Sequence, residues 1–190
     1  MSENNYIGFA QNDKGEYIEG YLSNKENFNG VLFLLREPNT NGKIQEEFWF
    51  KNSLEKNSHQ RNFSLYKNKF NIYLKYLNGE YNLSDCAYAN IRPTDGEKRK
   101  SDKYNEMNNE RILDRFMSIV KACDNKVKFV FTCYDIFDAL KEAPNSQSIE
   151  GSGIKYRKSN KTKRVMRIGN ITVYEIYHPS YTKYPKEKYD

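Results

Sequence analysis

A run of five apolar side chains, Val31–Leu35 (VLFLL), constrains the fold of this chain more than any other feature. Successive side chains of a strand point to opposite faces of its sheet, so a continuously apolar run is typical of a strand that is buried on both faces. Such strands belong to parallel sheets that are covered by helices on both sides. Pro38 follows closely and is expected to end the strand.

The rest of the chain alternates short apolar segments with segments of helical spacing. Further strands are expected at residues 85–91, 128–133, 164–168 and 170–177. Apolar residues at spacings of three and four predict helices at residues 43–55, 61–77 and 105–123, and a short helix at residues 135–141. Strands that alternate with helices are typical of crossover connections between parallel strands.

We therefore expect an α/β fold with three layers (α/β/α) and a central, mostly parallel sheet of about four strands. With 190 residues the chain has the length of a single domain, 1–190. Residues 1–30 are polar and broken by glycines, which predicts an irregular or hairpin-like lead-in. Residues 151–168 are basic, begin near Gly151 and Gly153, and predict a hairpin or loop.

Composition limits the classes of protein that this chain can belong to. Its 28 aromatic rings (16 Tyr, 11 Phe and one Trp) indicate a folded protein despite a mean hydropathy of −0.95. No run of 18 apolar residues and no signal-peptide pattern is present, so we expect a soluble, cytoplasmic monomer that makes no membrane contact. Three cysteines without metal-ligand spacing predict reduced core residues, and neither a metal nor a cofactor is expected.

Polar side chains follow the predicted strands at their carboxyl ends, where ligands bind in parallel α/β folds. Arg36 and Glu37 come after the first strand, and Asn90 and Arg92 come at the end of the second. His178 follows the last strand. A proline follows closely after each of these sets of polar residues. Its ring restricts the backbone of the turn and thereby the direction of the polar side chains. We expect the carboxylate, the carboxamide and the imidazole to meet at one edge of the sheet.

In these segments the sequence resembles the uracil-DNA glycosylase superfamily. The matching segments are VLFLLREPN at 31–39, CAYANIRP at 86–93, FVFTCYDIFDAL at 129–140 and VYEIYHPSY at 173–181. The HPSY stretch is the most specific of them, followed by ANIRP with its basic loop. The resemblance implies a glycosylase that hydrolyses the N-glycosidic bond of uracil or a related modified base in DNA, without metal or cofactor.

The resemblance also implies roles for individual residues. His178 would donate a hydrogen bond to the departing base, and Glu37 would orient or deprotonate water and stabilise the cationic sugar. Asn90 would read the Watson-Crick edge of the base. An aromatic ring near residues 48–50 would stack on the flipped base, either Trp49 or Phe50.

Contacts with DNA are expected at the same motifs and in the basic segment. Ser180 would contact a phosphate, and Tyr181 would enter the gap left by the flipped nucleotide. Arg36 is expected to contact phosphate or to pair with Glu37, and Arg92 to contact DNA. A net charge of +6 favours an anionic partner, with Lys158 and Arg164 as further candidates in the basic segment.

Two departures from the family pattern leave an alternative open. Glu37 stands where relatives have Asp, Asn or Ala, and Leu35 stands where Gly is usual. If these two departures have ended catalysis, the chain is a catalytically inactive glycosylase-like module that binds nucleic acid or a nucleotide. A metal-dependent α/β nuclease is a second alternative, although clustered carboxylates for Mg²⁺ are not evident in the sequence.

Overall fold

The computed structural model describes residues 8–36, 46–92, 109–150, 153–156 and 159–179. Within these ranges the strands are β1 (Gly20–Tyr21), β2 (Val31–Leu35), β3 (Ala87–Asn90), β4 (Phe129–Cys133), β5 (Ser146–Ile149), β6 (Lys155–Tyr156), β7 (Ser159–Thr162), β8 (Val165–Ile168) and β9 (Ile171–Ile176). The helices are α1 (Trp49–Glu55), α2 (Arg61–Leu74), α3 (Asn109–Ala122) and α4 (Tyr134–Leu140), with a 3-10 turn at Leu83–Asp85.

Seven of these strands form one mixed sheet in the order β1-β3-β2-β4-β9-β8-β5, and β6 and β7 form a separate pair. The four neighbours β3, β2, β4 and β9 are mutually parallel. The α/β class is therefore confirmed. The sheet has more strands than the four expected, because antiparallel strands extend the parallel centre at both edges. Strand β1 pairs with β3, β8 with β9, and β5 with β8.

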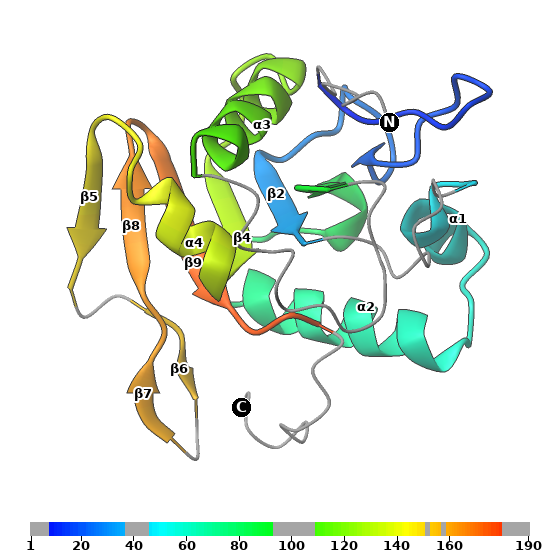
Figure 1. Cartoon of the computed structure of the whole chain (residues 1–190). Helices are drawn as coiled ribbons and strands as arrows, with labels where there is room; N and C mark the ends of the chain where they lie inside the picture. Colours follow the sequence, from blue (N-terminus) through cyan, green and yellow to red (C-terminus); the bar gives the residue numbers. More distant parts are fainter. Residues whose placement is uncertain (1–7, 37–45, 93–108, 151–152, 157–158, 180–190) are drawn as a thin grey trace, which may run out of the picture.

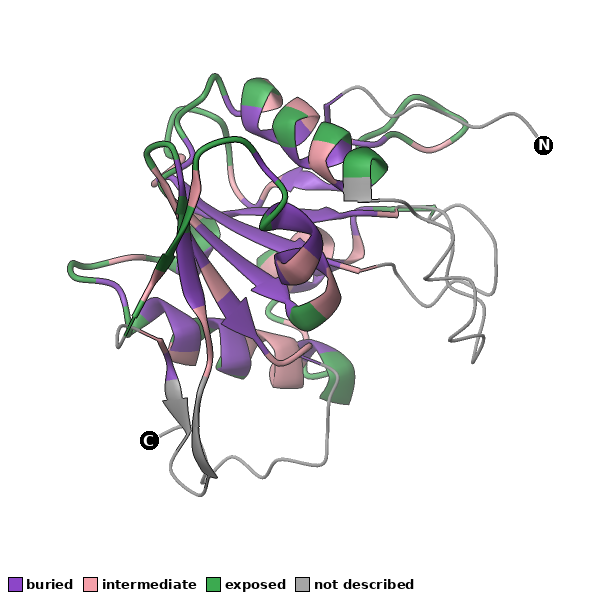
Figure 2. Cartoon of the chain, turned by 60° about the vertical axis from the view of Figure 1, so that its left-hand side comes forward, coloured by how far each residue is buried: buried purple, intermediate pink, exposed green. Residues whose placement is uncertain are grey.

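Helices cover both faces of the sheet, as Figure 1 shows. The side chains of β2 explain the arrangement: Val31, Phe33 and Leu35 pack with residues of α1 and α2, whereas Leu32 and Leu34 pack with residues of α3 and α4. All five are fully buried. Figure 2 shows the strands as the buried layer between exposed outer helix faces. The apolar run thus reflects one strand that contributes to two cores.

Two of the helices have ends that differ from the sequence pattern. The first, expected at residues 43–55, begins at Trp49 in the described part of the chain. The second ends at Leu74 instead of residue 77, because the chain tightens there into turns in which Tyr76 and Leu77 bond three residues back. Apolar spacing continues past the end of α2 because Leu77, in the turn that follows, also packs on the core.

The N-terminal segment is tied into the fold through a buried carboxylate. Glu19 is 1% exposed and forms an ion pair with Arg115 of α3. Its two oxygens also accept hydrogen bonds from the backbone N–H groups of Ala10 and Asn90, each at 2.9 Å. The expected irregular lead-in therefore includes the edge strand β1 and a buried anchor beside β3.

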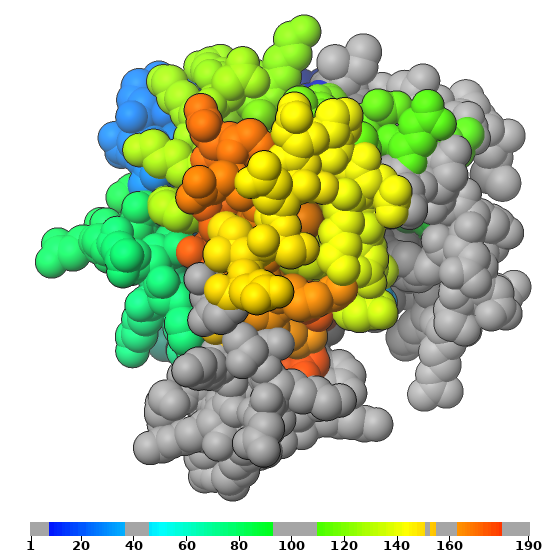
Figure 3. Space-filling view, turned by 90° about the vertical axis from the view of Figure 1, so that its left-hand side faces the viewer, coloured from blue at the N-terminus to red at the C-terminus, as the bar shows by residue number. Residues whose placement is uncertain are grey.

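The other edge of the sheet consists of β8 and β5. Figure 3 views the molecule from this side, where β5 lies at the surface next to β8. The outward residues Gln147 and Ser148 are exposed, and the strand lacks an apolar run, which is why the sequence did not predict it. The basic segment before β8 contains the antiparallel pair β6–β7. No helix in the described ranges has the length and hydropathy needed to cross a membrane.

Candidate functional site

The carboxyl ends of the four parallel strands bring polar residues to one edge of the sheet, which we call the strand-end rim. Arg36 follows β2, Asn90 ends β3, Asp135 lies in the first turn of α4 directly after β4, and His178 follows β9. The register of β2 and β3 places Leu35 beside Asn90. These residues come from four separate parts of the sequence, and the parallel topology alone brings them together.

His178 is largely buried at this rim. Its ring meets the ring of Tyr66 edge to face, with centroids 5.9 Å apart. Burial, together with the positive charges of Arg36 and Lys69, lowers the pKa of His178 to about 4. The imidazole is therefore neutral at physiological pH and carries one N–H donor.

Helix α2 holds the segment that carries this imidazole. The ammonium of Lys69 donates a hydrogen bond of 2.7 Å to the carbonyl oxygen of Pro179, and the hydroxyl of Tyr73 donates one of 3.1 Å to the carbonyl of Tyr177. Lys69 is only 4% exposed, and burial lowers its pKa to about 8. Two backbone carbonyls on either side of His178 are thus bound to one helix.

Arg36 pairs with Asp135. Its Nε lies 3.0 Å from each oxygen of that carboxylate, and both side chains are partly exposed. The expectation that Arg36 contacts phosphate or pairs with Glu37 stays a prediction, and the structure adds Asp135, in the first turn of α4, as a partner. Glu37 lies outside the described residues, so its predicted catalytic role stays a prediction.

Asn90 is buried, with 2% of its surface exposed. Its side-chain oxygen accepts a hydrogen bond of 3.4 Å from the hydroxyl of Tyr88, two residues earlier on β3. Residues two apart on a strand share a face, and Tyr88 belongs to the core on the α1 and α2 side. Asn90 and His178 therefore lie on the same face of the sheet, because His178 contacts Tyr66 of α2.

The two candidate stacking rings differ in their surroundings. Phe50 is 1% exposed and stacks on Tyr88 with centroids 5.5 Å apart and planes 7° apart, which places it in the core. Trp49 is half-buried and meets Tyr66 edge to face at 5.7 Å. Since Tyr66 in turn contacts His178, Trp49 lies one ring away from the imidazole.

Arg92 and Arg164 were expected to contact DNA. The backbone N–H of Arg92 donates to the carbonyl of Arg36 at 3.2 Å, which places Arg92 at the rim. Arg164, directly before β8, bonds two carboxylates in the protein: Glu175 of β9 through Nε and Asp138 of α4 through Nη1, each at 2.7 Å. Lys158, Ser180 and Tyr181 lie outside the described residues.

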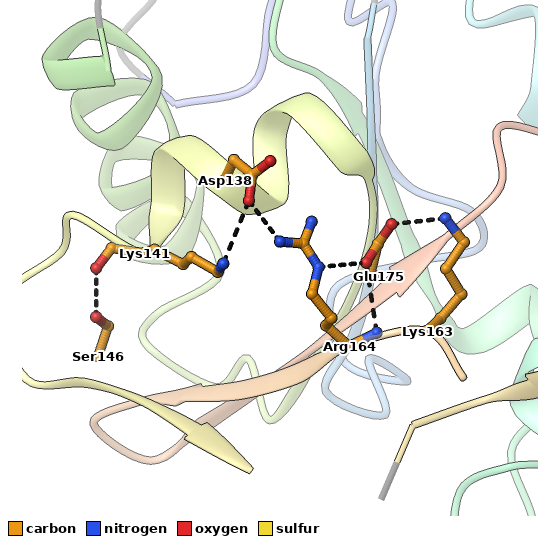
Figure 4. Close-up of polar contacts among 6 residues, drawn as sticks. All are labelled: Asp138, Lys141, Ser146, Lys163, Arg164 and Glu175. Atoms are coloured by element: carbon orange, nitrogen blue, oxygen red, sulfur yellow. Dashed lines mark hydrogen bonds and ion pairs between the residues drawn. The ribbon is translucent and has the colours of Figure 1, made fainter. Parts of the chain in front are cut away.

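Figure 4 shows the ion-pair cluster around Arg164. Glu175 also accepts from the ammonium of Lys163 at 2.6 Å. Burial by itself would raise the pKa of Glu175, but the hydrogen bonds from Arg164 and Lys163 outweigh it and lower the pKa. The guanidinium of Arg164 also lies 5.0 Å from the ring centre of Tyr134 and 4.8 Å from that of Phe137. These ion pairs connect the residues directly before β8 to β9 and α4.

Two residues at or next to the strand-end rim were not predicted from the sequence. Asp135 was included in a predicted helix, although its position two residues after a buried strand is the same signal that selected the other candidates. Lys69 stands four residues before Tyr73 and three after Tyr66, on the apolar stripe of a predicted helix. The position of a lysine on that apolar stripe could have indicated a buried cation.

The described ranges contain no group of three or more His, Cys, Asp or Glu side chains placed to hold a metal ion. In comparisons with known proteins, no family model, no curated protein and no solved structure matches the chain. The chemistry of the strand-end rim is therefore the basis for assigning a function.

Proposed function

We propose that this protein is a DNA glycosylase that hydrolyses the N-glycosidic bond of uracil or a related modified base, as a divergent member of the uracil-DNA glycosylase superfamily. One observation carries the proposal. A neutral imidazole, His178, lies beside the two cations Arg36 and Lys69 at the carboxyl ends of parallel strands. That is the ligand-binding edge of this kind of sheet.

The arrangement of the fold supports the proposal. The resemblance implies a sheet with a parallel centre between helices, and β3, β2, β4 and β9 form such a centre. The matching segments 31–39, 86–93, 129–140 and 173–181 each contain one of these four strands. Each segment also contributes a polar residue to the strand-end rim, so the resemblance and the geometry select the same edge of the sheet.

The charges at the rim suit the departure of a base. When the glycosidic bond breaks, the base takes the electron pair and becomes anionic, while the sugar becomes cationic. A neutral imidazole donates a hydrogen bond to the developing oxyanion without first carrying a charge, and nearby cations stabilise the anion further. His178 is the proposed donor, and Arg36 and Lys69 supply the positive charge.

The carboxylate that handles water and the cationic sugar is proposed to be Glu37. It follows Arg36 directly in the sequence. The cation Arg36, which also pairs with Asp135, would favour the ionised form of a neighbouring carboxylate. As a carboxylate, Glu37 would orient water and stabilise the cationic sugar.

Asn90 is the proposed reader of the base. Its side-chain oxygen accepts from Tyr88, which turns the amide nitrogen into the group that a base carbonyl would meet. A donor at this point favours a carbonyl over an amino group on the base, which distinguishes uracil from cytosine. Of the two stacking candidates, Trp49 is the better placed, because Phe50 is enclosed by core rings.

We propose hydrolysis without a lyase step. A lyase would need an amine that attacks the sugar C1′ carbon and forms an imine there. Lys69 is the lysine that the described structure places next to His178, and its ammonium donates to the carbonyl of Pro179. Borohydride should therefore trap no covalent complex with abasic DNA, and a trapped complex would contradict this part of the proposal.

The direct test is excision from a uracil-containing oligonucleotide without added metal. The protein should release the base and leave an alkali-labile site, and His178→Ala should lower the rate by about 10²–10³ because an oxyanion donor is lost. Glu37→Gln should lower it to a similar extent. Binding of the oligonucleotide without base release would indicate the inactive module instead, and metal-dependent strand cutting would indicate a nuclease.

A further inference from the structure

Three residues on one stripe of α2 contact three consecutive residues after β9. Tyr66, Lys69 and Tyr73 are spaced by three and four, so they lie on the same side of the helix. In order, they contact the ring of His178, the carbonyl of Pro179 and the carbonyl of Tyr177. The segment that carries the imidazole is therefore bound to the helix at every one of its residues.

Lys69 is the unusual member of this stripe. Among the described lysines it is the one that the structure buries, and its neighbours on the helix include Phe70 and Leu74 of the core. An ammonium in such a place is unfavourable unless a hydrogen bond or a charge compensates it. A side chain that served packing alone would be apolar, so the ammonium calls for a reason beyond packing.

We infer that Lys69 is a positioning residue for His178. Its hydrogen bond to the carbonyl of Pro179 fixes the backbone immediately after the imidazole, and its charge faces the ring. The reason for holding the ring rests on the proposed function, in which the N–H of His178 must point at a base oxygen. The positioning itself is a property of the folded protein and does not depend on that function.

The groups around His178 come from three elements. Lys69 and Tyr66 face it from α2, Arg36 faces it from the end of β2, and Asp135 of α4 lies behind Arg36 as its ion-pair partner. The two cations and the burial all act in one direction and favour the neutral ring. Removal of the Lys69 charge therefore shifts the titration of His178 upward, whereas a charge-conserving replacement does not.

The experiment compares Lys69→Met, Lys69→Arg and Lys67→Met by NMR. Lys67 belongs to the same helix but is only partly buried and bonds Asn57 at the surface, which makes it a matched control. The chain has two histidines, so His178→Ala assigns the signals. Two readouts are followed: the pKa of the His178 ring, and the through-space contact between the rings of His178 and Tyr66.

In Lys69→Met the pKa of His178 should rise above its wild-type value of about 4 but stay below the ordinary 6.5, because burial and Arg36 still lower it, and the contact with Tyr66 should weaken. Lys69→Arg should restore both, and Lys67→Met should leave both unchanged. A folded Lys69→Met protein with the wild-type titration and ring contact would overturn the inference. If Lys69→Met does not fold, Lys69→Gln replaces it as a second variant without the charge, and a wild-type titration and ring contact in that variant overturn the inference equally.

Activity measurements then separate this inference from the proposed function. If the wild-type protein excises uracil, Lys69→Met should lower kcat at least tenfold with little change in KM, and Lys69→Arg should recover most of the loss. If the wild-type protein shows no excision, the proposed function fails, and the NMR comparison still decides whether Lys69 positions His178.

Discussion

The Nε of Arg36 lies 3.0 Å from both carboxylate oxygens of Asp135, so an ion pair joins the carboxyl ends of β2 and β4. The pair fixes the direction of a guanidinium whose charge acts on His178. Asp135 thus acts on the strand-end rim through Arg36.

Asp135→Asn tests this pair. Excision should fall about tenfold or more, because a misdirected guanidinium no longer stabilises the departing base. The free energy of unfolding should change by less than about 1 kcal/mol, since the pair is partly exposed. Asp124→Asn is the matched control, because Asp124 pairs with Lys25 at 2.8 Å on the surface. Equal activity of the two variants would remove Asp135 from the site.

The stability of the protein should depend on His178 at acid pH. Burial holds the pKa of this ring at about 4, whereas the unfolded chain has a value near 6.5. Below pH 6.5 the unfolded state binds the extra proton, so the free energy of unfolding falls as the pH decreases toward 4. The two pKa values correspond to a loss of up to about 3 kcal/mol.

Urea unfolding at pH 7.0 and pH 4.5 measures this loss. The wild-type protein should lose more stability between these two values than His178→Gln, which cannot bind the proton. His59→Gln is the control, since His59 is exposed in the loop before α2. An identical pH dependence in the wild type and in His178→Gln would mean that another group causes the acid sensitivity.

At alkaline pH the stability of the protein should depend on Lys69. Burial lowers the pKa of its ammonium to about 8 from the ordinary 10.5, so the unfolded state binds more protons between these values. The free energy of unfolding of the wild type should therefore rise relative to Lys69→Met from pH 8 to pH 10.5, by up to about 3 kcal/mol. Urea unfolding over that range gives the difference. A constant difference would show that Lys69 keeps its ordinary pKa.

The buried pair of Glu19 and Arg115 should contribute strongly to stability. Glu19→Ala removes the carboxylate that accepts from Arg115 and from two backbone N–H groups, and it leaves a buried guanidinium without its anion. The expected loss is about 3–5 kcal/mol by urea unfolding at pH 7. Combining it with Arg115→Met should cost less than the sum of the two single changes. Strict additivity would indicate that the two side chains do not act as a pair.

Local pattern was enough to predict the strands of the parallel centre and the helices between them. The run Val31–Leu35 is a strand with those bounds, and the segments before Asn90 and His178 also hold strands, because continuous burial leaves a mark in each short stretch of sequence. Helix ends were less predictable, since apolar spacing at residues 75–77 continues into a turn that packs on the same core.

The sequence by itself determined the α/β class and the choice of strand ends as the place for a site, because hydrophobic periodicity records which faces are buried. Tertiary structure alone decided that Arg36 meets Asp135, that the buried Lys69 bonds the carbonyl of Pro179 next to His178, and that β1, β8 and β5 extend the sheet. These contacts join residues far apart in the chain, and their energies depend on distance and burial, which no local stretch of sequence specifies.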